Sequence, residues 1–90
     1  MKQNDRVFLA HILDAITQIK SYTAGLSYDQ FSKTRLVQDG VIRQLEIIGE
    51  ASRNLSDEFR DRSPEIPWSQ IISLRNRLIH AYFEVNLGII

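Results

Sequence analysis

Hydrophobic residues recur along this chain with the three-to-four-residue spacing of an α-helix. The first such face is formed by Leu9, Ile12, Ile16 and Ile19. This spacing predicts a helix from about Asn4 to Tyr22. Asn4 belongs to the residue types that cap helix starts, and Gly25 lies in the break that follows.

The middle of the chain predicts a short helix and then a long one. The segment SYDQ, residues 27–30, has the pattern of a capping box that opens a short second helix. The third helix is expected from about Lys33 to Asn54. Its apolar stripe consists of Val37, Val41, Ile48, Ala51 and Leu55.

The opposite side of this third helix is charged, with spacings that permit ion pairs among Asp39, Arg43, Glu46, Glu50 and Arg53. Gly40 and Gly49 also lie inside it. Each glycine is unfavourable there by roughly 1 kcal/mol relative to alanine. We therefore expect both glycines to let another helix approach closely.

The last third predicts two further elements. Ser56 can cap a short helical turn through Phe59. After the break at residues 63–67 (SPEIP), Pro67 is well placed as the first residue of a fourth helix that runs to about Phe83. Asn86 looks like another cap, and residues 87–90 (LGII) look like the first turn of a further helix. We expect either that a last helix is missing or that this apolar tail docks onto a neighbour.

No segment alternates in polarity as a strand would, so the predicted fold is all-α. An antiparallel four-helix-type bundle is the simplest architecture. The chain has 90 residues, which predicts a single domain covering residues 1–90 with a small core. Because such a domain has a narrow stability margin, burying a face against a second copy would stabilise it. We therefore expect a homodimer.

Composition narrows the possible functions. The chain has 11 basic and 11 acidic residues, a net charge of zero and no cysteine. Zero net charge disfavours a protein that binds along nucleic acid through its overall positive charge. A local pair of cations can still bind one phosphate. Two histidines without cysteines make a poor zinc site. We expect no metal and no cofactor. No apolar run approaches the roughly 20 residues that span a bilayer, and we expect a cytoplasmic protein without membrane contact.

The fourth predicted helix carries an anomaly. On a helical wheel, Arg75 falls in the middle of the apolar arc, whereas Arg77 points the opposite way. The arc comprises Trp68, Ile71, Ile72, Leu78 and Ile79. An unpaired buried arginine is very costly. Arg75 should therefore pair with a carboxylate, for which Glu46 and Glu50 are candidates, or face a water-filled groove, unless the helix is rotated so that it reaches solvent.

Asn76 and His80 are four residues apart and hence stack on one edge of this helix. The Asn76 amide could hold the His80 imidazole in one tautomer. Taken alone, a histidine beside an apolar face is more often a core or surface residue than a catalyst. His11 is isolated on the first helix, and we expect no functional role for it.

Residues 75–82, RNRLIHAY, match the pattern R-x-x-x-x-H-x-Y. With the segments RQLEIIGEA (residues 43–51) and PEIPW (residues 64–68), this resembles the HepT-like toxins of the HEPN superfamily from about residue 5 onward. The resemblance implies a metal-independent endoribonuclease, usually the toxin of a toxin–antitoxin pair. It assigns the catalytic groups to Arg75, His80 and the polar partner Asn76. Tyr82 corresponds to the tyrosine to which a cognate minimal nucleotidyltransferase antitoxin attaches AMP.

The residue types suit that chemistry. Histidine can act as general acid or base near neutral pH. Arginine is always positively charged and can donate two parallel hydrogen bonds to a phosphate. However, Arg75 and His80 are separated by about 140° around the helix and about 7.5 Å along it. One protomer would not easily aim both at one phosphate, so two fourth helices crossing at a two-fold axis are expected to form a shared groove.

Two other readings remain open. The chain could be a catalytically inactive helical interaction module that binds a nucleotidyltransferase partner. It could also be simply a structural helical dimer. In the main reading, Arg43, Glu46 and Glu50 are candidate supporting or ion-pair residues of the site.

Overall fold

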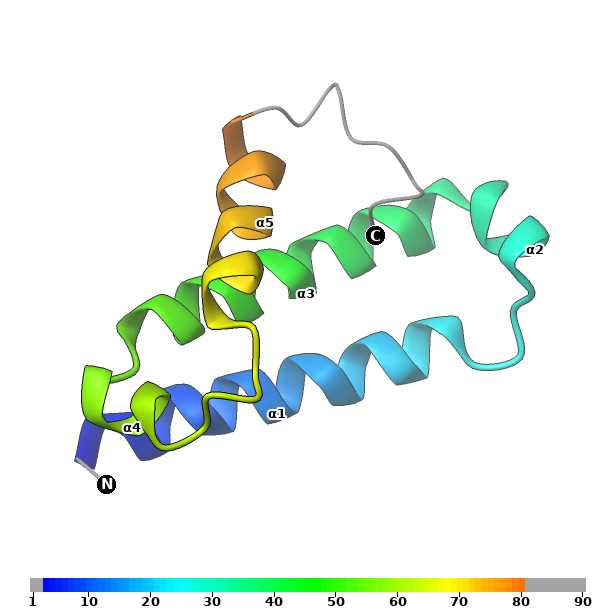
Figure 1. Ribbon diagram of the computed structural model, residues 1–90. Helices are drawn as coiled ribbons and strands as arrows, with labels where there is room; N and C mark the ends of the chain where they lie inside the picture. Colours follow the sequence, from blue (N-terminus) through cyan, green and yellow to red (C-terminus); the bar gives the residue numbers. More distant parts are fainter. Residues whose placement is uncertain (1–2, 81–90) are drawn as a thin grey trace.

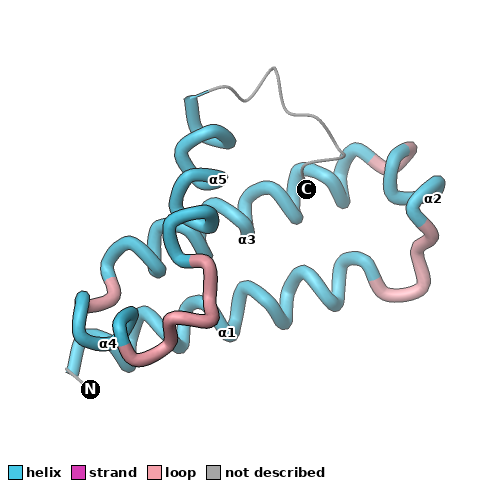
Figure 2. Tube along the Cα trace, in the orientation of Figure 1, coloured by secondary structure: helices cyan, strands magenta, loops and turns pink. Residues whose placement is uncertain are grey.

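The computed structural model describes residues 3–80, which contain five helices and no strand (Figures 1 and 2). The long helices are α1 (Gln3–Thr23), α3 (Arg35–Asn54) and α5 (Trp68–His80). The short helices α2 (Tyr28–Ser32) and α4 (Asp57–Asp61) lie in the two connections. The predicted all-α class is confirmed.

α3 is the central element. α1 and α3 lie side by side and run in opposite directions, and α5 lies across α3 (Figure 1). The core where these helices meet α4 contains Ile12, Ala51 and Leu55. Partly buried side chains of Phe8, Ile48, Phe59 and Trp68 pack against it. Most of the predicted stripe of α3 is therefore buried, whereas Ile16 of the predicted α1 face remains 37% exposed.

Helix starts follow the local sequence closely. The Ser27 hydroxyl accepts from the Gln30 N–H at 3.1 Å, and the Gln30 side chain accepts from the Ser27 N–H at 2.9 Å. This capping box opens α2 as predicted. Ser56 likewise caps α4 by accepting from the Phe59 N–H at 3.1 Å.

Three predicted boundaries shift by one or two residues. α1 already includes Gln3, so Asn4 lies inside the helix and does not cap it. α3 begins at Arg35 because the Lys33 and Thr34 N–H groups still donate to carbonyls of α2. α5 begins at Trp68, with the Pro67 carbonyl accepting from the Ile71 N–H. Its predicted end at Phe83 lies outside the described residues.

Asp5 joins the start of α1 to the start of α4. Its carboxylate is 2% exposed and accepts from the Ser56 N–H at 2.8 Å and from the Ser56 hydroxyl at 2.7 Å. The pairing fixes the corner from which the chain leads into α5.

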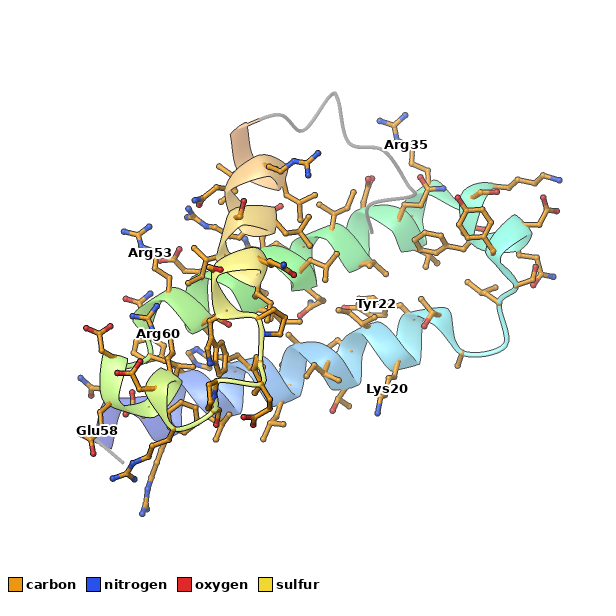
Figure 3. All side chains as sticks on the ribbon, viewed as in Figure 1. Lys20, Tyr22, Arg35, Arg53, Glu58 and Arg60 are labelled. Carbon is orange, nitrogen blue, oxygen red and sulfur yellow. The ribbon has the colours of Figure 1, made fainter. Side chains whose placement is uncertain are left out.

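The two helix-interior glycines of α3 each face a close neighbour, as predicted. A Cβ at Gly40 would lie 3.1 Å from the Tyr22 ring, which points from α1 toward α3 (Figure 3). A Cβ at Gly49 would overlap the Cβ of Arg75 and lie 3.3 Å from the Ile71 carbonyl oxygen. Gly49 therefore allows α5 to lie directly on α3. No helix within residues 3–80 is long and apolar enough to span a membrane.

Candidate functional site

Arg75 lies where α5 crosses α3. Its Cβ and Cγ sit over Gly49, and its side chain is 18% exposed. On the same helix Leu78 is buried, whereas Arg77 is exposed and lines a different, shallow hollow on the outer side. The wheel prediction, with Arg75 on the packed face and Arg77 on the solvent face, is confirmed.

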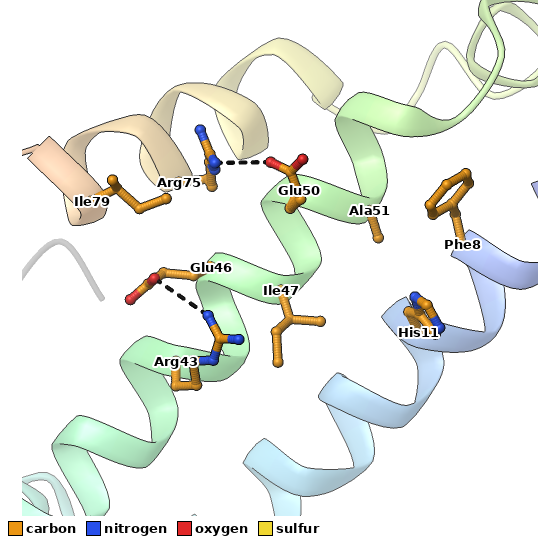
Figure 4. A pocket seen from close by; sticks show the side chains of 9 residues that line it. All are labelled: Phe8, His11, Arg43, Glu46, Ile47, Glu50, Ala51, Arg75 and Ile79. Carbon is orange, nitrogen blue, oxygen red and sulfur yellow. Dashed lines mark ion pairs between the residues drawn. The ribbon is translucent and has the colours of Figure 1, made fainter.

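The guanidinium of Arg75 is held by two groups. Its Nη2 lies 2.9 Å from Oε2 of Glu50 on α3 (Figure 4). Its Nη1 donates to the Asn76 amide oxygen at 2.9 Å. Of the two carboxylates predicted as partners, Glu50 is the one used. Glu46 instead pairs with Arg43, at 3.8 Å between Oε2 and Nη1.

The Arg75–Glu50 contact is an ion pair without complete hydrogen bonding. Within the described part of the chain, Glu50 Oε2 and Arg75 Nε are buried and have no hydrogen-bond partner of good geometry. The other carboxylate oxygen of Glu50 accepts from the Asn54 amide at 3.1 Å. Since buried unsatisfied polar atoms are costly, this ion pair leaves part of the hydrogen-bonding capacity of both side chains unused.

Arg75 also borders an open pocket of about 200 Å³ between α1, α3 and α5 (Figure 4). Its apolar lining comes from Phe8, Ile47, Ala51 and Ile79, and its polar lining comes from His11, Arg43, Glu46, Glu50 and Arg75. Arg75 thus has both of the environments that the sequence left open, a carboxylate partner and a groove.

His80 is the last residue of α5 that the structure describes. Its side chain and Tyr82 lie outside the described residues, so the expected Asn76–His80 contact stays a prediction. What is observed is that the Asn76 amide oxygen accepts from Arg75. The polar residue after the arginine therefore orients Arg75.

His11 lies at the same pocket, a placement that the sequence did not predict. It is exposed on α1 and lines the pocket together with Arg75, although the two are far apart in sequence. Its ring meets Phe8 edge-on, with centroids 6.2 Å apart and an interplanar angle of 84°. The only available signal was the three-residue spacing of Phe8 and His11, which places both on one side of a helix.

The fold and this arrangement define an all-helical domain with a polar site centred on an arginine. A histidine follows this arginine five residues later on the same helix. The chain belongs to the ribonuclease HepT-like family, whose model matches residues 12–90.

Named relatives agree with this assignment. A probable ribonuclease HepT from Thermococcus cleftensis is 40% identical over 90 residues, which cover 100% of this chain and 82% of the relative. An RNase candidate from Methanocaldococcus jannaschii is 42% identical over 89 residues, covering 99% of this chain and 74% of the relative.

A second M. jannaschii protein, named as a gamma-glutamylcyclotransferase and RNase candidate, is 43% identical over 89 residues. This chain spans only 40% of its length. No solved structure matches the chain significantly.

Proposed function

We propose that this chain is a metal-independent endoribonuclease that cleaves RNA with Arg75 and His80. The observation that carries the proposal is the position of Arg75. Its guanidinium is held by Glu50 and Asn76 at the edge of an open pocket, on the helix that carries His80. A fixed cation at the mouth of a groove is suited to bind a phosphate.

The reaction would proceed by attack of a ribose 2′-oxygen on the adjacent phosphorus. His80 serves as base or acid: one imidazole removes the 2′-hydroxyl proton, and a protonated imidazole donates to the departing 5′-oxygen. Arg75 stabilises the charge that develops on the non-bridging oxygens. The bond from phosphorus to the 5′-oxygen breaks as the 2′-oxygen bond forms. The products are a 2′,3′-cyclic phosphate and a 5′-hydroxyl.

Two copies of the chain would form the site. Arg75 and His80 are about 140° apart around α5, so crossing α5 helices bring both residue types to one phosphate more easily than a single copy does. Several large apolar side chains on α1 and α5 support a dimer because they are exposed in the single chain, among them Leu13 at 57% and Ile79 at 40%. A second copy covering them would remove apolar surface from water.

Tyr82 would switch the activity off. We propose that the chain is the toxin of a toxin–antitoxin pair and that a minimal nucleotidyltransferase antitoxin transfers AMP to the Tyr82 hydroxyl. The support is the HepT-like family membership and the sequence position of Tyr82, two residues after His80. AMP at this position would add bulk and negative charge where the RNA phosphate must bind.

The decisive experiment incubates the purified protein with total RNA in the presence of EDTA. Wild type should cut the RNA, whereas Arg75→Ala and His80→Ala should lose on the order of 100-fold or more in rate. Arg77→Ala is the matched control because Arg77 lies on the opposite side of α5. Intact RNA with unmodified wild type would leave the inactive interaction module as the better description.

The switch has its own test. Co-expression with a minimal nucleotidyltransferase should raise the intact mass of the wild-type chain by one AMP group and abolish cleavage. Tyr82→Phe should stay unmodified and active under the same conditions. Modification of Tyr82→Phe, or full activity of the modified wild type, would refute the switch.

A further inference from the structure

The pocket beside Arg75 has the size and lining of a site for one small ring. At about 200 Å³ it is smaller than the roughly 300–1,000 Å³ of pockets for drug-sized ligands. Ile47 and Ala51 of α3 line it between the two flanking helices (Figure 4). A planar group that entered would lie between α1 on one side and the Arg75 side of α5 on the other.

The α1 side of this pocket is aromatic. The Phe8 ring is partly buried against the core, and it meets the exposed His11 ring edge-on at 6.2 Å. The core contact fixes Phe8, which in turn limits where the His11 ring lies. Proteins commonly bind unpaired RNA bases by stacking them on histidine, phenylalanine or tyrosine rings. His11 therefore offers a stacking surface.

The α3 side of the pocket carries the carboxylates of Glu46 and Glu50 beside the cation of Arg43. The Glu46 side chain is 21% exposed, and its ion pair with Arg43 is long, at 3.8 Å between Oε2 and Nη1. Arg43 itself is 69% exposed. Since a carboxylate accepts from the exocyclic amino group of a base and repels a carbonyl oxygen, Glu46 favours a base with an amino group on that edge.

We propose that this pocket binds the base next to the cleaved phosphate and prefers cytosine or adenine over uracil. The inference rests on the proposed function, since it takes the phosphate to lie at Arg75. His11 stacks on the base, Glu46 accepts from its amino group, and Arg75 binds the adjoining phosphate. The pocket would thereby make RNA cleavage selective for the base beside the cleaved phosphate.

Cleavage of matched RNA oligonucleotides that differ in one cytosine or uracil tests the preference. Wild type should cut beside cytosine about tenfold faster than beside uracil. Glu46→Gln should remove most of this difference because an amide can also donate to the uracil oxygen. His11→Ala should slow both substrates about tenfold. Thr17→Ala and Glu58→Gln, exposed residues that do not line the pocket, serve as matched controls.

Binding provides a readout that does not need cleavage. In NMR titrations, 5′-CMP should shift the ring signals of Phe8 and His11 at lower concentration than 5′-UMP, and His11→Ala should weaken both. Equal cutting beside both bases, or equal binding of both nucleotides, would overturn the inference while leaving the nuclease intact. CMP binding by a protein that cuts no RNA would instead reject the proposed function and keep the pocket.

Discussion

Gly49 on α3 and Arg75 on α5 occupy what would be overlapping space if Gly49 had a side chain. A Cβ built at Gly49 would collide with the Arg75 Cβ and lie 2.8 Å from its Cγ. The missing side chain lets the stem of Arg75 rest on the α3 backbone. From there its guanidinium reaches Glu50, one residue further along α3, at 2.9 Å.

We expect Gly49→Ala to destabilise the fold and displace Arg75. Alanine gains roughly 1 kcal/mol in helix propensity, but overpacking at this crossing costs about 1–3 kcal/mol. The atoms in the way are a side-chain stem and the Ile71 carbonyl, which move only if α5 moves. Urea unfolding at fixed protein concentration should show a lower midpoint. RNA cleavage should fall as well.

Gly40→Ala is the matched control within the same helix. Its new methyl group would meet only the Tyr22 ring, at 3.1 Å. This ring is the far end of a side chain and can tilt away, so the propensity gain should offset most of the strain. A loss of stability equal to that of Gly49→Ala would contradict the assigned role of the α3–α5 crossing.

Glu50→Gln should separate binding from catalysis. Removing a negative charge beside the phosphate position should lower KM for RNA, and kcat should fall because Arg75 loses the partner that orients it. Stability should change by no more than about 1 kcal/mol because the pair is partly exposed. Steady-state kinetics on a defined oligonucleotide measures both constants. The control Glu58→Gln on α4 should alter neither KM nor kcat. A raised KM for Glu50→Gln would argue against a phosphate at Arg75.

Arg75→Lys should keep the positive charge and still lose most of the activity. A lysine ammonium is a compact point charge. Unlike the planar guanidinium, it cannot bind a carboxylate, the Asn76 amide and a phosphate at the same time. We expect at least about a tenfold loss in kcat/KM, consistent with losing one transition-state hydrogen bond. Arg77→Lys should change kcat/KM by less than about threefold. Similar losses from both substitutions would contradict the separate roles of the two faces of α5.

The Asp5–Ser56 contact predicts a measurable coupling energy. Asp5→Ala should destabilise the protein by about 1–3 kcal/mol because two donors of Ser56 lose their acceptor. In a double-mutant cycle with Ser56→Ala, the coupling should exceed about 0.5 kcal/mol. Unfolding followed through the fluorescence of Trp68 provides the measurement. Asp14 is an exposed aspartate on the same helix, and Asp14→Ala is the control. Purely additive effects of Asp5→Ala and Ser56→Ala would refute the coupling.

Local order was largely predictable from the sequence. The apolar spacing gave the helices, and Ser27 and Ser56 marked two starts, because both signals depend on neighbours only a few residues away. The prediction that Asn4 caps the first helix was wrong, because its residue type permits capping but does not require it. The wheel position placed Arg75 on the packed face of its helix, and a carboxylate partner was one of the alternatives that the sequence left open.

The tertiary structure decided which partners meet. Glu46 and Glu50 were equivalent candidates along the helix, and only the crossing of α5 over Gly49 selected Glu50. His11 belongs to no polar cluster in its own segment, yet packing of α1 against α3 brings it to the pocket that Arg75 borders. Helix periodicity determines which way a side chain faces, whereas the position and angle of a crossing depend on interhelical packing that no single segment encodes.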